Sequence, residues 1–141
     1  MQKFNLKLFS DFNQIQIWDE DWESLEPPEW NDDAVNNFAC FDDKALFLGV
    51  IENDDHNILL TIHDEKPSVN LDAWDHIVEA PFHTPTGNIE IAEEPIELPP
   101  GQYVVRWCIK ALGDGRAQYQ LDMWSGESSE VTVIKKMDQS S

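Results

Sequence analysis

An acidic run from Asp19 to Asp33 holds the residues whose types and spacing most clearly point to chemistry with a partner. It contains eight carboxylates and two tryptophans, Trp22 and Trp30, and it lacks lysine and arginine. Carboxylates at this density attract a positive surface and speed encounter with it. Tryptophan is enriched among the residues that dominate binding energy at interfaces. We therefore predict a contact surface for a basic protein, made by Asp19, Glu20, Asp21, Trp22, Glu23, Glu26, Glu29 and Trp30.

The same run has a second interpretation, as a solvated loop whose charge only keeps the protein soluble. Trp22 stands between carboxylates on both sides, so it is either a binding anchor or a plug over a sheet edge. Pro27-Pro28 keeps the middle of the run extended. The sequence leaves the choice between anchor and plug open.

Other residues that carry out chemistry in proteins lack the spacing of a catalytic or metal site. The histidines have no i, i+4 pair of the helical zinc type, although His63 and His83 could meet across strands. The Asp75-His76 pair has no nucleophile elbow beside it. Cys40 and Cys108 lie in apolar stretches and are predicted to be buried, reduced thiols. We expect a non-enzymatic protein with no catalytic residue, metal or cofactor.

The charge of the whole chain narrows the classes of partner. The 141 residues include 28 Asp and Glu against 9 Lys and Arg, a formal net charge of -19. This charge repels phosphate backbones and anionic membrane surfaces, so we expect neither nucleic-acid nor membrane binding. The first residues lack the apolar segment of a signal peptide, which predicts a cytoplasmic protein.

The elements that would position these residues are mostly strands, because apolar residues recur with a period of two. The pattern predicts one hairpin within residues 4–17, a second within 45–62, a strand from Asp75 to Phe82 that stops near Pro81, and a turn at 113–115. Asn31 is a candidate N-cap for one short helix that ends near Phe38. We predict an all-β protein, an antiparallel β-sandwich of about nine or ten short strands with one short helix. Residues 1–136 would form a single domain, and 137–141 a polar tail.

Four segments resemble the bacterial competence protein J family and its uncharacterised relatives. They are Trp30-Asn31-Asp32-Asp33-Ala34-Val35, residues 71–80, residues 87–91 and residues 96–106, and the resemblance covers about residues 4–112. It implies a small inhibitor of a DNA-entry nuclease that acts by direct protein contact. The resemblance is one of strands and turns, and it carries over no functional residue.

Two further functions fit the sequence. Six tryptophans would suit a carbohydrate-binding β-sandwich module if several of the rings lay on one open face. A structural domain whose acidity only maintains solubility would need no binding surface. The positions of the tryptophans distinguish the first of these alternatives from the others.

Overall fold

The structure is a computed structural model that describes residues 2–9, 14–22, 38–42, 45–50, 55–92, 94–113, 116–127 and 130–136. These residues form eleven strands and one 3-10 turn, η1. The elements are β1 (Gln2–Phe9), β2 (Gln14–Asp19), β3 (Ala39–Asp42), β4 (Ala45–Gly49), β5 (Asp55–His63), η1 (Leu71–Ala73), β6 (His76–Thr84), β7 (Asn88–Ile91), β8 (Glu94–Glu97), β9 (Gly101–Gly113), β10 (Arg116–Ser125) and β11 (Thr132–Lys135).

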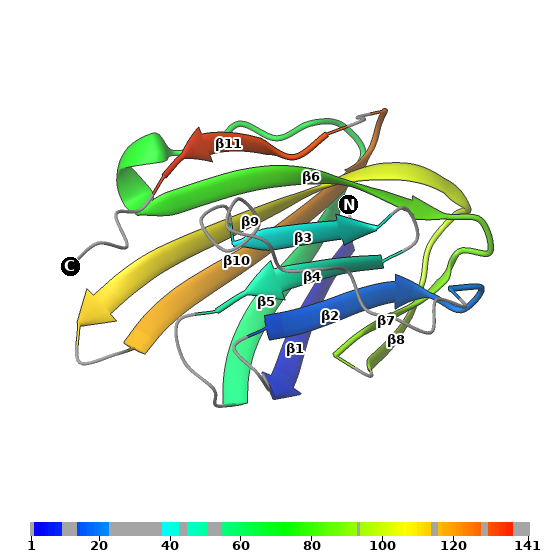
Figure 1. The fold of residues 1–141 in the computed structure, drawn as a ribbon, viewed down its shortest axis with the longest axis horizontal. Helices are drawn as coiled ribbons and strands as arrows, with labels where there is room; N and C mark the ends of the chain where they lie inside the picture. Colours follow the sequence, from blue (N-terminus) through cyan, green and yellow to red (C-terminus); the bar gives the residue numbers. More distant parts are fainter. Residues whose placement is uncertain are drawn as a thin grey trace.

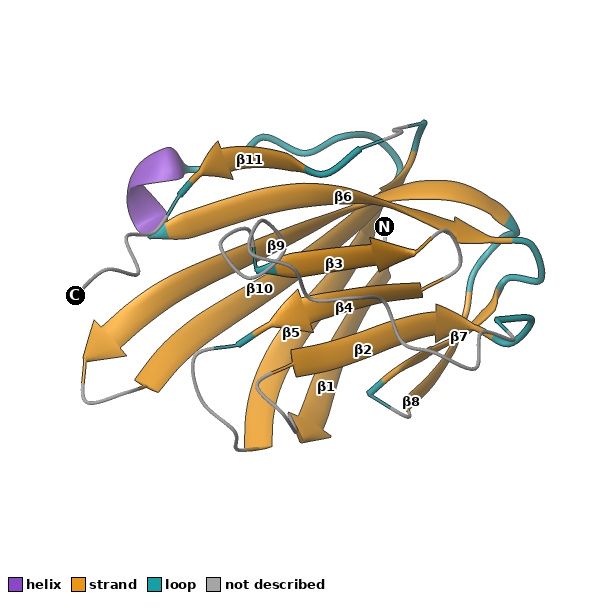
Figure 2. Cartoon of the chain, viewed as in Figure 1, coloured by secondary structure: helices purple, strands orange, loops and turns teal. Residues whose placement is uncertain are grey.

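The strands form two sheets. One has six strands in the order β1-β5-β10-β9-β6-β11, and the other has five in the order β3-β4-β2-β7-β8. In Figure 1 the short strands β2, β3 and β4 cross in front of the long strands of the six-stranded sheet. Figure 2 shows that strands dominate the described chain, with the 3-10 turn beside β11. The prediction of an all-β protein is confirmed.

One hydrophobic core receives side chains from both sheets. Ile17 and Leu46 enter it from the five-stranded sheet, and Val105 and Leu121 enter it from the six-stranded sheet. Each of these side chains is at most 1% exposed. In β2 the burial alternates residue by residue, as expected for a strand with one face on a core.

Trp107 ties the two sheets together inside this core. Its ring is stacked on Tyr119, with centroids 5.1 Å apart, and its Nε1 donates a 2.8 Å hydrogen bond to the carbonyl oxygen of Gly49. Gly49 also lies against Phe38, whose Cδ1 would be 3.0 Å from an added Cβ atom. Trp107 therefore joins β9 to the end of β4 across the core.

Strand pairing differs from the prediction at both early hairpins. β1 pairs with β5, and β2 pairs with β4 and β7, so the two strands of each predicted hairpin lie in different sheets. β5 and β10 pair in parallel, which corrects the purely antiparallel expectation. Residues 64–115 separate these two strands, long enough for the crossover connection that parallel pairing requires. β9 pairs antiparallel with β10, with Gly113 opposite Arg116, as the predicted turn at 113–115 requires.

The strand predicted from Asp75 to Phe82 is present as β6, but it does not stop near Pro81, because β6 continues through Pro81 to Thr84. β11 pairs with β6 only at residues 77–79, so Pro81 lies where the other edge of β6 has no described neighbour. Proline is tolerated at such an edge, where its missing N–H is not needed.

The short helix of the prediction is not seen. Its residues 31–37 lie outside the described part of the chain, and Phe38, at its predicted end, has a φ of 59°. The described helical segment is the single turn Leu71–Ala73, where the Asn70 side chain accepts a 3.1 Å hydrogen bond from the Asp72 amide. Within the described ranges, no helix is long and apolar enough to cross a membrane.

Candidate functional site, an acidic surface beside paired tryptophans

The structure describes four of the eight predicted contact residues, Asp19 to Trp22, at the end of β2. The other four, Glu23, Glu26, Glu29 and Trp30, lie outside the described residues. The four described side chains divide into three groups with different environments. Asp19 is buried, Glu20 and Asp21 are exposed, and Trp22 is half-buried.

Asp19 is fully buried, so its carboxylate is not part of the solvent-facing surface that the sequence predicted. Its Oδ1 accepts hydrogen bonds from the Thr84 hydroxyl and, at 2.8 Å, from the Thr86 hydroxyl. The Thr86 amide adds a longer bond of 3.3 Å to Oδ1, and the Asp21 amide donates to Oδ2 at 2.8 Å. Burial raises the pKa of Asp19, but these hydrogen bonds outweigh burial and hold the pKa below its ordinary value of 3.8.

The alternation of buried and exposed residues in β2 indicates that Asp19 is buried. Ile15 and Ile17 face the core, and Asp19 continues the same inward face two residues later. The sequence interpretation assigned Asp19 by its charge and not by its position in the strand. Thr84 and Thr86, which satisfy the buried carboxylate, carry no sequence signal that would pair them with a residue 65 or 67 positions away.

Two hydrogen bonds hold Glu20 beside the turn between β6 and β7. The Glu20 amide donates to the Asn88 carbonyl at 3.0 Å, and the Asn88 side-chain amide donates to Glu20 Oε1 at 3.2 Å. The Trp22 amide donates back to the Asp19 carbonyl at 2.9 Å, which closes a turn around Glu20 and Asp21. The loop therefore presents two exposed carboxylates on a backbone that is bonded at both ends.

Cys40, Ala45 and Phe47 form a second, smaller apolar cluster, and the half-buried rings of Trp18 and Trp22 pack against it. The Trp22 ring is stacked near that of Trp18, with centroids 5.9 Å apart, and meets Phe47 edge-on at 6.0 Å. Trp18 and Phe47 belong to the outward side of the five-stranded sheet, because Ile17 and Leu46 between them face the core. Trp22 therefore covers part of this side of the sheet and is itself half-buried.

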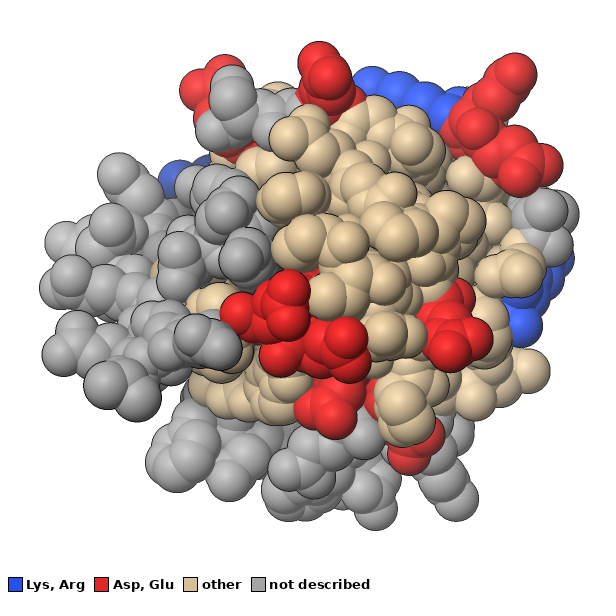
Figure 3. Space-filling view, turned by 90° about the vertical axis from the view of Figure 1, so that its right-hand side faces the viewer, with Lys and Arg blue, Asp and Glu red and all other residues tan. Residues whose placement is uncertain are grey.

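Further carboxylates lie on β7 and β8, and one of them, Glu90, contacts this cluster. Trp18 Nε1 donates a 2.9 Å hydrogen bond to Oε2 of Glu90, its partner in the β2–β7 pairing. Glu94 and Glu97 are exposed on β8. Figure 3 shows Asp and Glu side chains at several places on this end of the molecule, whereas Lys and Arg lie at its margins. The described part of this surface carries mainly acidic side chains, and Glu90 lies beside Trp18.

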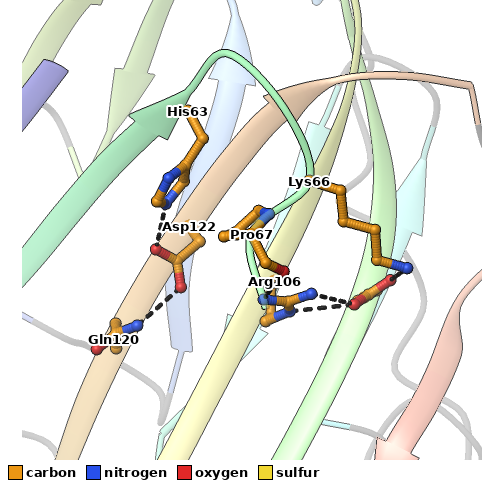
Figure 4. A network of polar contacts seen from close by, with 7 residues as sticks. His63, Lys66, Pro67, Arg106, Gln120 and Asp122 are labelled. Atoms are coloured by element: carbon orange, nitrogen blue, oxygen red, sulfur yellow. Dashed lines mark hydrogen bonds and ion pairs between the residues drawn. The ribbon is translucent and has the colours of Figure 1, made fainter. Parts of the chain in front are cut away.

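A separate polar network lies on the outward side of the six-stranded sheet (Figure 4). Arg106, only 2% exposed, bonds Glu79 Oε2 through Nε at 3.0 Å and Nη2 at 2.9 Å, and its Nη1 donates to the Pro67 carbonyl at 3.1 Å. Its guanidinium lies 4.9 Å from the centre of the Trp124 ring. Lys66 reaches the other oxygen of Glu79 at 3.7 Å. These contacts hold the segment around Pro67 against the sheet.

Asp122 and His63 complete the network on the neighbouring strands. His63 Nε2 lies 2.8 Å from Asp122 Oδ1, and Gln120 donates to Asp122 Oδ2 at 2.8 Å. Burial, reinforced by the charge of Asp122, raises the pKa of the nearby Cys108 thiol to about 12. A thiol with this pKa is not a thiolate at neutral pH and is a poor nucleophile. Cys108 is therefore not an activated nucleophile beside this network.

The remaining candidate reactive residues are also engaged in structural contacts. Asp75 Oδ2 accepts a 2.8 Å hydrogen bond from the Ala111 amide, and the His76 ring is buried with its centroid 4.8 Å from that of Phe38. Cys40 and Cys108 are buried thiols outside any disulfide, as predicted. In the part of the chain that the structure describes, no three His, Cys, Asp or Glu side chains are arranged to hold a metal ion.

The fold matches two solved structures over most of the chain. One is ComJ from Bacillus subtilis, an inhibitor of the DNA-degrading activity of NucA, with a TM-score of 0.67 and 20% sequence identity. The other is the product described as crocagin biosynthetic gene J, with a TM-score of 0.52 and 12% identity. Each match covers 89% of this chain and 96% of the other. No family model and no curated protein matches the sequence. The chain therefore has the fold of ComJ, as its resemblance to the competence protein J family implied.

Proposed function

We propose that this chain is a non-enzymatic inhibitor that binds a nuclease by direct contact. The observation that carries the proposal is the similarity of its fold to ComJ, a nuclease inhibitor, across 89% of the chain. The two sheets with their shared core would form the β-sandwich on which the contact surface is built. A net charge of -19 supports a basic partner, because opposite charge on two proteins steers and accelerates their association.

The contact surface of this proposal begins with the exposed carboxylates of Glu20 and Asp21. It continues along the chain through Glu23, Glu26, Glu29 and Trp30, as the sequence predicted. Glu20 and Asp21 would compete with DNA phosphates for the cationic groups of the nuclease. The buried Asp19 makes no contact with the partner, and Trp22 supports the surface from its position on Trp18 and Phe47.

The test is inhibition of NucA from Bacillus subtilis, the nuclease that ComJ inhibits. DNA degradation is measured at increasing ratios of this protein to NucA and at increasing salt. We expect inhibition at near-equal concentrations that weakens as salt rises, because charge screening shortens to about 8 Å at physiological ionic strength. Absence of inhibition and of binding at low salt would overturn the assignment of NucA-type nucleases as partners.

A pair of double variants separates the proposed surface from net charge. E20K/D21K reverses the exposed loop charges, whereas E65K/D72K reverses two exposed charges on the segment that carries Lys66 and Pro67. Both change the net charge by the same amount. We expect E20K/D21K to weaken binding about tenfold or more and E65K/D72K to change it by less than about threefold, because local charge pairs dominate screened interactions.

The described tryptophans do not favour the carbohydrate-binding alternative. Such a module needs several rings on one open face. Trp107 and Trp124 are buried at 0% and 4% exposure, and Trp18, Trp22 and Trp74 are half-buried. None of these five described rings is an exposed platform.

A further inference from the structure

Asp19 joins two segments that lie far apart in the sequence, the loop after β2 and the turn between β6 and β7. We propose that Asp19 is a positioning residue, which orders both segments into one preformed contact surface without touching the partner. This inference rests on the proposed function. It adds a residue that organises the surface and a second chain segment, around Asn88, that belongs to it.

The hydrogen bonds of Asp19 reach both segments at once. Oδ2 takes the Asp21 amide of its own loop, whereas Oδ1 takes the hydroxyls of Thr84 and Thr86 on the other side. Thr84 then accepts a 3.0 Å bond from the Gly87 amide through the same hydroxyl. One buried carboxylate thus fixes the backbone on both sides of the junction.

The same junction also fixes the position of the exposed residues Glu20 and Asn88. Thr86 Oγ1 accepts a 3.0 Å hydrogen bond from the Asn88 amide, and Asn88 bonds Glu20 through both its carbonyl and its side chain. Glu20, Asp21 and Asn88 are all exposed. The carboxamide of Asn88 therefore lies beside the carboxylates of the loop and is available, with them, to a cationic group of the partner.

Order in the free protein strengthens binding because a loop that is already fixed loses little conformational freedom in the complex. Immobilising a side chain or loop residue on association costs about 0.5–1.5 kcal/mol. A loosened junction would transfer this cost to the binding step. It would leave the number of exposed charges, and therefore electrostatic steering, unchanged.

The experiment compares Thr86→Val, Thr86→Ser and the control Thr132→Val in the full chain. Valine at position 86 removes the hydroxyl from Asp19 and Asn88, whereas serine keeps it. Thr132 is exposed on β11, so its valine variant controls for the loss of an exposed hydroxyl away from the junction. Amide hydrogen exchange is measured at Glu20, Asp21 and Trp22, together with the association and dissociation rates for NucA.

We expect Thr86→Val to accelerate amide exchange at these three residues about tenfold or more, while exchange in the core strands changes little. We expect its complex with NucA to dissociate about three- to tenfold faster at a nearly unchanged association rate. Thr86→Ser and Thr132→Val should both behave like the unmodified protein.

Exchange at Asp21 and Trp22 that is the same in Thr86→Val as in the unmodified protein would overturn the positioning role. Faster exchange without faster dissociation would also overturn it, because order in the loop would then be irrelevant to binding. A failure of the unmodified protein to bind NucA would instead remove the proposed nuclease contact, and the exchange comparison would still decide whether the junction orders the loop.

Discussion

The indole of Trp18 on β2 and the carboxylate of Glu90 on β7 are joined by a 2.9 Å hydrogen bond on the outward side of the five-stranded sheet. This bond connects the aromatic cluster to the acidic surface. Trp18 is also stacked near Trp22, so it contacts both β7 and the loop that carries Glu20 and Asp21.

Replacement of Glu90 tests this link. Glu90→Gln keeps an acceptor for the indole, whereas Glu90→Ala leaves the half-buried Nε1 without it. We expect Glu90→Ala to lower the free energy of unfolding by about 1 kcal/mol and Glu90→Gln to change it by less than about 0.5 kcal/mol. Urea unfolding followed by tryptophan fluorescence measures both. Equal losses in the two variants would show that the hydrogen bond is not the source of the effect.

Gly87 is the second position where we expect a large and specific effect. Its φ is +77°, and an added Cβ atom would lie 2.1 Å from the carbonyl oxygen of Leu98. Gly113 has a similar φ of +87°, but no atom of the described residues lies within 4 Å of an added Cβ atom there. Gly87→Ala therefore adds a backbone clash to the strain of a left-handed conformation, whereas Gly113→Ala adds the strain alone.

We expect Gly113→Ala to cost about 1–2 kcal/mol and Gly87→Ala at least about 1 kcal/mol more. The comparison needs only the two unfolding midpoints and slopes in urea. A Gly87→Ala variant as stable as Gly113→Ala would contradict the tight packing of this turn against the segment that follows β8.

Much of the secondary structure could be predicted, because alternation in the sequence directly reports which side of a strand is buried. The pairing of the strands could not. β1 and β2 both turn an apolar face to the same core, so the pattern is equally satisfied when they pair with each other or with strands of different sheets. The order of the strands depends on contacts between distant segments, such as β5 beside β10, that no local pattern encodes.

In the candidate site, too, the sequence shows the type of each residue but not its contacts with residues far away in the chain. The acidic character of Glu20 and Asp21 is visible in the sequence, but the partners of Asp19 are 65 and 67 residues away. Arg106 stands on the side of β9 opposite to Trp107 and would be solvated if that side were open. It is buried because the segment around Pro67 lies over it, which the sequence of β9 cannot reveal.

Arg106 provides a test of the network under this segment. Arg106→Met removes the charge and leaves Glu79 and the Pro67 carbonyl without their hydrogen bonds from the guanidinium. Breaking one side of a buried ion pair costs about 3–5 kcal/mol, and we expect a loss in this range. Lys66→Met, at an exposed position 3.7 Å from the same carboxylate, should cost less than about 1 kcal/mol. A small loss for Arg106→Met in urea unfolding would mean that the pair is not needed to hold the fold.

The reaction rate of the Cys108 thiol measures how well the region around Arg106 is buried. We measure it in a Cys40→Ala background, so that one thiol remains. Because Cys108 is fully buried and its pKa is raised to about 12, the folded protein should react with a thiol reagent far more slowly than the unfolded protein, by about 100-fold or more. Arg106→Met should accelerate the reaction. A folded Cys108 that reacts at the unfolded rate would contradict the burial.

The pH dependence of stability tests the ionised state of Asp19. Its pKa in the folded protein lies below 3.8, so the unfolded chain takes up the proton more readily than the folded one. Stabilisation by the ionised group is therefore fully present above the unfolded pKa and is lost as the pH falls through the folded pKa. We expect Asp19→Asn to be less stable than the unmodified protein from about pH 5 to pH 8, with a difference that shrinks below about pH 4. Thr132→Val, which removes no titratable group, should differ from the unmodified protein by an amount independent of pH. A stability difference for Asp19→Asn that stayed constant down to pH 3, or grew, would show that the folded state does not favour the ionised carboxylate.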